Sequence, residues 1–273
     1  TMTLQGPSDY AVPVIRIEDL EGTLQTVLFG YACHATTLCD NYLSGDYPGY
    51  AQAELEITYP GVTAMFFQGC GADQNPLPRD KVSQAVRYGK QLAASVQQVL
   101  SEDMRLQESS LRTCYEEIPL LFDKMDSREQ LSQMAAQDNY FGRWARAMVA
   151  RLDKGEKFPA SYPYPMSCWM IGAQRVFALG GEVTSGYSIL LKERYGSDVI
   201  VMGYCHDVMT YIPTEALWHE GSYEVEDVNK VKRHSKPSLK APQGGIIQKE
   251  MPLNVCKVQL ICPACNKPSR VAH

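Results

Sequence analysis

The chain has 273 residues, of which 45% are hydrophobic and 21% are charged, as is ordinary for a globular protein. Its net charge of −5 hides an asymmetry. Residues 226–273 hold nine basic and three acidic residues, a net +6, so the residues before them carry −11. No apolar run approaches the ~20 residues of a membrane-spanning helix, so no membrane passage is expected. The change of sign predicts two segments with different partners.

The first ten residues, TMTLQGPSDY, show neither a basic nor an apolar leader segment, so no signal peptide is visible. They do not resemble the natural beginning of a protein, and we expect further sequence upstream. The nine cysteines are an odd number at scattered spacings, which favours reduced thiols over a disulfide framework. Cys262 and Cys265 form one CxxC pair, whereas a structural zinc ribbon needs two pairs.

Strand and helix patterns alternate along the first half of the chain. One helix is expected to begin at Asp46-Tyr47-Pro48, because an acidic cap and an early proline favour helix starts, and to end before Pro60-Gly61. Periodicity predicts a β-hairpin, that helix, a buried strand, a long amphipathic helix and a further strand. Their ranges are 11–17 with 24–32, 46–59, 62–67, 82–100 and 111–121.

The second half continues this alternation. We predict an amphipathic helical stretch from Ser127 to Leu152, a loop, a strand, a helix and a further strand. The last four span residues 154–165, 169–179, 184–195 and 199–204. The predicted fold class is α/β, with a mixed sheet and packed helices over residues 1–225. A small β-rich basic tail is expected over residues 226–273.

Three polar side chains follow predicted strands, where open α/β sheets place their sites. His34 is either a zinc ligand or a hydrogen-bonded histidine that caps the strand. Glu182 follows two glycines and is a metal ligand, a general base or a first-turn glutamate favoured by the helix dipole. Tyr211 is a phenolate ligand, a proton donor to an oxyanion or a half-buried tyrosine. For each residue in isolation the structural alternative is the simpler one.

Residues 69–76, GCGADQNP, form a loop too polar for a core strand and too compact for a linker. Asp73 can act as a base, and Asn75 can orient an oxyanion or a substrate amide. The alternative is an Asx-turn before Pro76, which suffices for stability. Nearby thiols would allow a sulfur-rich zinc site but are more often buried and inert. They belong to Cys33, Cys39 and Cys70.

Four segments in order resemble the neutral/alkaline, non-lysosomal ceramidase family over about residues 11–223. They are Cys33-His34-Ala35-Thr36-Thr37, Ser44-Gly45-Asp46-Tyr47-Pro48-Gly49-Tyr50-Ala51, Gly181-Glu182-Val183-Thr184 and Tyr211-Ile212-Pro213-Thr214. The resemblance implies an α/β catalytic domain with Zn²⁺ held by His34, Glu182 and Tyr211. It implies hydrolysis of an amide (N-acyl) bond in a small-molecule or lipid-like substrate, with Asp73 and Asn75 positioning water or an oxyanion.

The chain departs from this family in two places. The family's first zinc histidine lies in a His-x-His-Ser segment before the matched region, so His34, Glu182 and Tyr211 just reach the three protein ligands of a catalytic zinc. The family's catalytic serine lies in Gly-Asp-Val-Ser-Pro, where this chain has Asn75 before Pro76. A ceramidase relative that binds a ligand without turnover is therefore an alternative.

The tail resembles a different family, the bacterial large-subunit ribosomal protein of the L-twenty-four type, in its C-terminal half. The matching segments are VNKVKRHSKPS, PQGGIIQKE and CPACNKPSRV within about residues 228–271. The resemblance implies phosphate contacts with ribosomal RNA and gives non-enzymatic RNA binding as the alternative function. The ceramidase resemblance implies a secreted or periplasmic location and the tail a cytoplasmic one. We hypothesise that gene assembly joined the two near residues 223–227.

Overall fold

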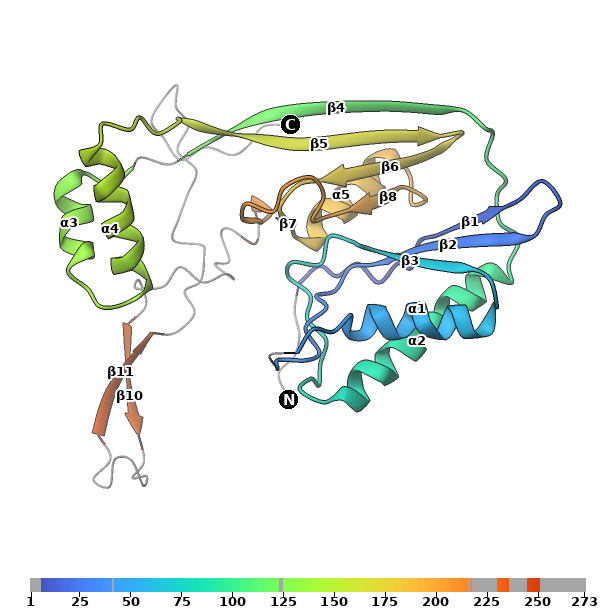
Figure 1. Cartoon of the computed structure of the whole chain (residues 1–273), viewed down its shortest axis with the longest axis horizontal. Coiled ribbons are helices and arrows are strands. Elements are labelled where there is room, and N and C mark those ends of the chain that lie inside the picture. The colour runs from blue at the N-terminus through green and yellow to red at the C-terminus, as the bar shows by residue number, and fades with distance from the viewer. Residues whose placement is uncertain are drawn as a thin grey trace. The chain divides into compact units, whose positions relative to one another are not determined.

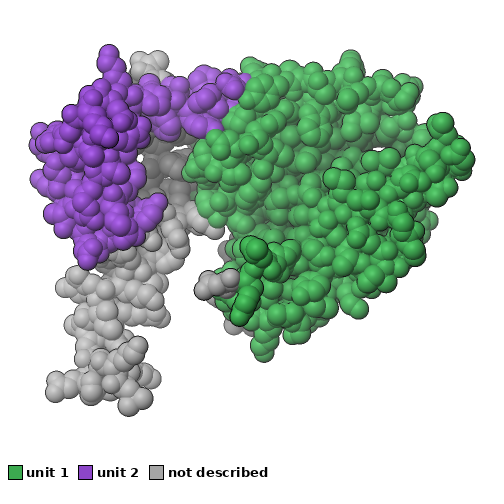
Figure 2. Space-filling view, in the orientation of Figure 1, with its two compact units in different colours: residues 1–116, 165–258 green, residues 117–164, 259–273 purple. Residues whose placement is uncertain are grey.

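The computed structural model describes residues 6–40, 42–122, 125–215, 217, 230–235 and 245–250. Two compact units make up the chain. Unit 1 consists of residues 1–116 and 165–258, and unit 2 of residues 117–164 and 259–273 (Figure 2). Helices and strands are mixed, as the predicted α/β class requires. Within the described ranges, no helix combines the length and the apolar character that crossing a membrane would take.

A three-stranded sheet with two helices forms the N-terminal half of unit 1 (Figure 1). β1 (Val14–Glu18) pairs antiparallel with β2 (Leu24–Tyr31), which pairs parallel with β3 (Thr63–Gln68). α1 (Asp46–Thr58) and α2 (Val82–Leu100) pack on one face of this sheet. These elements match the predicted hairpin, helices and strand, with three corrections. β1 begins at Val14 instead of residue 11, the N-cap of α1 is Gly45 instead of Asp46, and β3 is only partly buried, with Met65 50% exposed.

The core between this sheet and its helices is closely packed. Val27, Phe29, Leu55 and Val96 are fully buried in it. At Gly89 of α2 an added Cβ would lie 2.5 Å from the Tyr50 Cβ of α1, so only glycine allows the helices to approach this closely.

A second sheet has the strand order β4–β5–β6–β8. β4 (Leu111–Leu121) and β5 (Ser161–Ile171) continue from unit 1 into unit 2. β5 pairs antiparallel with β6 (Gln174–Leu179), and β6 pairs parallel with β8 (Ile200–Met202). The helix α5 (Ser185–Tyr195) connects β6 to β8.

The predicted single strand 169–179 is in fact a hairpin, and its first strand begins inside the predicted loop 154–165. The chain reverses at Gly172, whose φ of +58° favours glycine. β5 begins at Ser161 although Pro163 and Pro165 lie within it. Its pairing with β6 starts only at Met166, so residues 161–165 have no β6 partner and proline is tolerated there.

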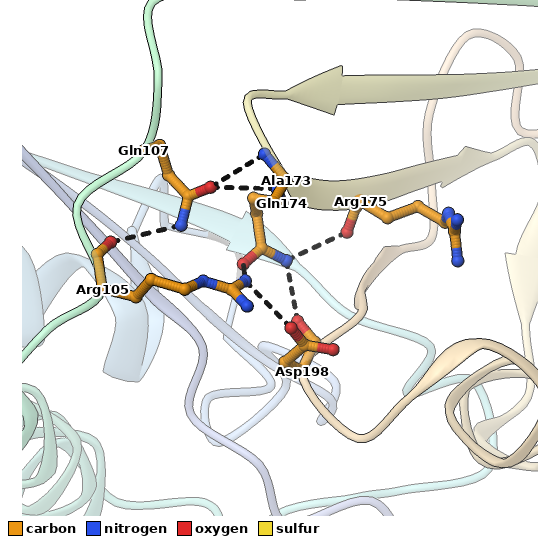
Figure 3. A network of polar contacts seen from close by, with 6 residues as sticks. All are labelled: Arg105, Gln107, Ala173, Gln174, Arg175 and Asp198. Carbon is orange, nitrogen blue, oxygen red and sulfur yellow. Dashed lines mark hydrogen bonds and ion pairs between the residues drawn. The ribbon is translucent and has the colours of Figure 1, made fainter.

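Polar contacts hold the β5–β6 turn to the segment that follows α2 (Figure 3). The Gln107 side chain accepts the N–H groups of Ala173 and Gln174 at 3.1 and 3.0 Å. Arg105 donates to the carboxylate of Asp198 at 2.9 Å, and the Gln174 side chain donates to the Asp198 carbonyl at 2.7 Å. The network therefore ties the turn to the residues that enter β8.

Unit 2 contains two helices where one amphipathic stretch was predicted. α3 (Arg128–Ala135) starts at a capping box formed by Ser127 and Gln130. α4 (Tyr140–Asp153) starts at Asn139, whose side chain accepts the Gly142 N–H at 2.8 Å. This second cap begins a new helix and breaks the stretch. Leu131 and Ala145 are fully buried in the unit.

In the tail, β10 (Lys230–Ser235) pairs antiparallel with β11 (Gly245–Glu250), in keeping with the short β segments expected there. The predicted boundary between residues 225 and 226 lies outside the described residues, as do Cys262 and Cys265. The boundary stays a prediction.

Candidate functional site

Segments far apart in the sequence meet beside His34 in unit 1. His34 follows β2, and Glu182 begins β7 (Glu182–Val183) just after β6. β7 pairs parallel with β9 (Tyr211–Ile212), which sets Glu182 beside Tyr211. The two larger sheets are joined where the Gly203 N–H donates to the Gln68 carbonyl at 3.0 Å. The structure thus brings together the three residues predicted as metal ligands, and their role as ligands stays a prediction.

The imidazole of His34 is oriented by the loop that follows β3. Its Nε2 lies 2.9 Å from the carbonyl oxygen of Ala72. Because a carbonyl oxygen only accepts, Nε2 carries the proton in this contact. The backbone N–H of His34 also donates to the Gln74 carbonyl at 2.9 Å. A neutral His34 therefore presents the lone pair of Nδ1.

The same cluster contains Tyr204, which sequence reasoning missed. Its hydroxyl lies 3.2 Å from Nδ1 of His34 and 3.3 Å from Oε2 of Glu182. The sequence placed Tyr204 inside the strand 199–204, whereas β8 ends at Met202. Tyr211 was singled out because it follows a predicted strand. Had the predicted strand ended at residue 202, the same criterion would have singled out Tyr204.

The donor atoms of this cluster fit zinc. Nε2 of His34 lies 4.0 Å from Oε2 of Glu182, and the two side chains are 14% and 25% exposed. The Tyr204 and Tyr211 rings meet the imidazole edge to face at centroid distances of 6.1 and 6.3 Å. Zinc accepts nitrogen and oxygen ligands, and a zinc-bound histidine usually donates its other N–H to a carbonyl or carboxylate, as Nε2 does to Ala72.

Acidic, thiol and imidazole groups alone do not make a metal site. In the part of the chain that the structure describes, no group of three or more His, Cys, Asp or Glu side chains could hold an ion. Burial raises the pKa of two flanking thiols, that of Cys33 to about 12 and that of Cys70 as well.

Asp73 has both carboxylate oxygens engaged. Oδ1 accepts the Ser185 N–H at 2.7 Å, and Oδ2 accepts the Ser185 hydroxyl at 2.8 Å. Ser185 is the first residue of α5, so the contact fastens the loop 69–76 to the start of this helix. These bonds give Asp73 a structural role in holding the loop to α5. Its role in positioning water stays a prediction.

Asn75 is exposed and lies at the edge of a cleft of about 370 Å³. Its Oδ1 accepts the Thr36 hydroxyl at 3.3 Å. Among the residues that the structure describes, those lining the cleft are rich in tyrosine and include no charged residue. They are Tyr10, Val12, Tyr31, Cys33, Tyr47, Asn75, Pro76, Leu77, Tyr88, Gln91, Leu92 and Ser95. Asn75 is therefore placed to contact a neutral group in this cleft.

An ion pair clamps the same loop from the N-terminal side. Both carboxylate oxygens of Asp9 contact Nζ of Lys192, at 2.9 and 2.7 Å, with side chains 12% and 18% exposed. Burial works to raise the pKa of Asp9, but hydrogen bonds from Lys192 and Ser188 outweigh it and leave the pKa lowered. The Asp9 N–H donates to the Gln74 side chain at 2.7 Å, which links the clamp to the loop.

Comparison of sequences with known proteins identifies a ribosomal family. The family model described as the C-terminal domain of large ribosomal subunit protein uL24 matches residues 228–273. The uL24 protein of Caldicellulosiruptor saccharolyticus is 59% identical over 49 residues, 18% of this chain and 44% of that protein. The one of Carboxydothermus hydrogenoformans is 53% identical over 82 residues, 30% of this chain and 76% of that protein. Through this part, the chain belongs to the uL24 family.

Comparison of structures gives a match over a larger share of the chain. Neutral ceramidase from Pseudomonas aeruginosa matches over 74% of this chain and 40% of its own, with a TM-score of 0.52 and 16% identity. A ceramidase complexed with C2 matches over 74% of this chain and 42% of its own, with a TM-score of 0.51 and 14% identity. This likeness shows a ceramidase-like α/β fold. The chain thus spans about two fifths of those ceramidases and under half of the first uL24 relative.

Proposed function

We propose that the region preceding the tail is a zinc-dependent hydrolase that cleaves an amide (N-acyl) bond. The observation that carries this proposal is the meeting of His34, Glu182 and two tyrosines. The Tyr204 hydroxyl lies 3.2 Å from Nδ1 of His34 and 3.3 Å from Oε2 of Glu182, and the Tyr211 ring lies beside the imidazole. The ceramidase-like fold supports the same reading at the level of the fold alone. His34, Glu182 and Tyr211 would hold the metal. A bound zinc would polarise the amide carbonyl and lower the pKa of water toward neutral.

The chain's own residues divide the remaining work. The Ala72 carbonyl fixes the tautomer and the orientation of His34 through Nε2. Asp73 keeps the loop that carries Ala72 against α5. Asn75, at the rim of the cleft, would hydrogen-bond the substrate amide. The cleft's tyrosines and lack of charge favour a neutral, lipid-like acyl group as the substrate's other end.

Metal analysis and amide hydrolysis by the full chain test this proposal together. We expect about one zinc per chain and turnover of an N-acyl amide, both lost in Glu182→Gln. Glu54→Gln is the matched control, because Glu54 lies in α1 and pairs only with Lys90 at 3.6 Å. The proposal would be contradicted if the wild-type chain contained no zinc and if His34→Ala hydrolysed the amide at the wild-type rate. Zinc binding without turnover would leave a ligand-binding relative in place of an enzyme.

We also propose that residues 228–273 bind ribosomal RNA, since the uL24 match covers them. The basic residues there would neutralise phosphates, so affinity should fall steeply with salt. Lys230→Gln with Lys232→Gln should reduce the salt slope by about 0.7–0.9 for each phosphate that is no longer neutralised. Lys90→Gln with Lys154→Gln gives a control of equal charge outside the tail. An unchanged slope in the tail variant would exclude RNA binding by this segment.

A further inference from the structure

We propose that Tyr204 is itself a ligand of the metal, so that a second phenol oxygen stands beside His34 and Glu182 in place of a second histidine. The inference rests on the proposed zinc site and assigns it a residue that no sequence pattern indicated. Its starting point is one atom. The Tyr204 hydroxyl contacts Nδ1 of His34 and Oε2 of Glu182, the two donor atoms that a metal would use.

The spacing of these atoms matches a zinc site. Ligands about 2.0 Å from zinc at a tetrahedral angle are about 3.3 Å apart. The Tyr204 oxygen lies 3.2 Å from Nδ1 and 3.3 Å from Oε2. The same separations are long for hydrogen bonds made by a hydroxyl, which prefer about 2.7–2.8 Å. The Tyr204 oxygen is thus spaced from each of the other two atoms as ligands of one ion are.

Proton counting favours the same arrangement. Nε2 of His34 carries the proton that it donates to Ala72, so a neutral His34 offers only a lone pair at Nδ1. The Glu182 carboxylate also only accepts. Tyr204 has one hydroxyl proton for these two acceptors, and one contact therefore lacks a hydrogen. A cation shared by the three atoms would satisfy all of them, with the phenol proton released to solvent.

The backbone holds Tyr204 at this position at a cost. Tyr204 has a φ of +56° and His206 one of +61°, values that are unfavourable for residues other than glycine. The Tyr204 N–H donates to the Gly181 carbonyl at 3.0 Å, next to Glu182. His206 contacts the Ser167 hydroxyl at 3.0 Å, which fastens the far side of the turn. Strained residues of this kind gather at functional sites, where the surrounding structure holds them in place.

The competing arrangement is a purely structural relay. In it a doubly protonated His34 donates from Nδ1 to Tyr204, which donates to Glu182. The two arrangements differ in what removal of the Tyr204 hydroxyl does to metal binding. In a relay the Tyr204 hydroxyl competes with the metal for Nδ1 of His34 and Oε2 of Glu182, so its removal would leave metal affinity equal or higher. A ligand makes it a contributor, so its removal would weaken binding.

The test compares Tyr204→Phe, Tyr211→Phe and the control Tyr195→Phe in the full chain. Tyr195 lies at the end of α5, stacked on Phe177. Zinc affinity is measured by competition with a chromogenic chelator, and we expect Tyr204→Phe to bind about 100-fold more weakly while the control is unchanged. Iron, added as Fe²⁺ and oxidised in air, gives a second readout. A phenolate on Fe³⁺ absorbs visible light, whereas imidazole and carboxylate ligands do not.

A weaker absorption band in Tyr204→Phe than in the wild type would support the inference. A Tyr204→Phe chain with wild-type zinc affinity and an undiminished band would overturn it, while the zinc site itself would stand. A wild-type chain that binds neither metal would instead refute the proposed function. Circular dichroism of each variant verifies that the fold is retained.

Discussion

His34 and Asp73 both follow strands of the same sheet, yet the contacts of the two side chains differ. The His34 ring faces Glu182, Tyr204 and Tyr211, and its Nδ1 lies 3.2 Å from the Tyr204 hydroxyl. Asp73 is held by two shorter bonds to Ser185 at 2.7 and 2.8 Å. A polar residue at a strand end thus becomes a candidate ligand only when its neighbours leave it a donor atom. Asp73 belongs to the scaffold that positions His34.

The largest effect that sharpens this contrast should come from the clamp on the scaffold. Asp9→Asn leaves the mostly buried Lys192 without its partner, and we expect it to lower the free energy of unfolding by about 3 kcal/mol. Asp198→Asn breaks a pair of similar length, 2.9 Å, whose side chains are more than half exposed, and should cost under ~1 kcal/mol. Urea unfolding measures both. Equal losses would show that the clamp contributes no more than a surface pair.

The clamp should also depend on pH. The folded-state pKa of Asp9 is lowered, so its contribution is fully present above the unfolded value of about 3.9. It is lost as pH falls through the folded-state pKa. Unfolding free energies measured from pH 6 down to pH 3 should therefore fall more for the wild type than for Asp9→Asn. Parallel curves would contradict the assigned cause of the shift.

The smallest effect should come from Asn75→Ser, which restores the residue type of the ceramidase segment. Asn75 is exposed and contacts Thr36 through one 3.3 Å bond, so stability should change by less than ~0.5 kcal/mol. Hydrolysis of N-acyl amides should instead respond, because the side chain lies at the rim of the cleft. A large decrease in stability with unchanged turnover would make Asn75 part of the scaffold as well.

Sequence patterns predicted much of the fold where the signal was local. Helix α2 was predicted from a 3.6-residue apolar repeat, and the end of α1 was predicted from Pro60-Gly61, which lie just beyond it. The β5–β6 hairpin was missed because apolar residues lie on both sides of the short turn at Gly172, so the predicted strand ran through it. The break between α3 and α4 was missed because it depends on the cap at Asn139.

The site divides along the same line. His34, Glu182 and Tyr211 were predicted as one cluster, and the structure brings them together. The engagement of Asp73 could not be predicted, because Ser185 is distant in the sequence and meets it only through tertiary packing. Tyr204 was hidden for a related reason. Its place depends on where β8 ends and on a left-handed backbone that no local pattern required.

One paired measurement tests the contrast between the cluster and its scaffold most directly. Zinc affinity and urea unfolding are measured on His34→Asn and Asp73→Asn in the full chain. We predict that His34→Asn weakens zinc binding by about 100-fold or more with little change in the metal-free stability. Asp73→Asn should cost about 1–3 kcal/mol of stability and weaken zinc binding much less than His34→Asn does. The reverse pattern, in which Asp73→Asn abolishes zinc binding and His34→Asn leaves it intact, would contradict the account.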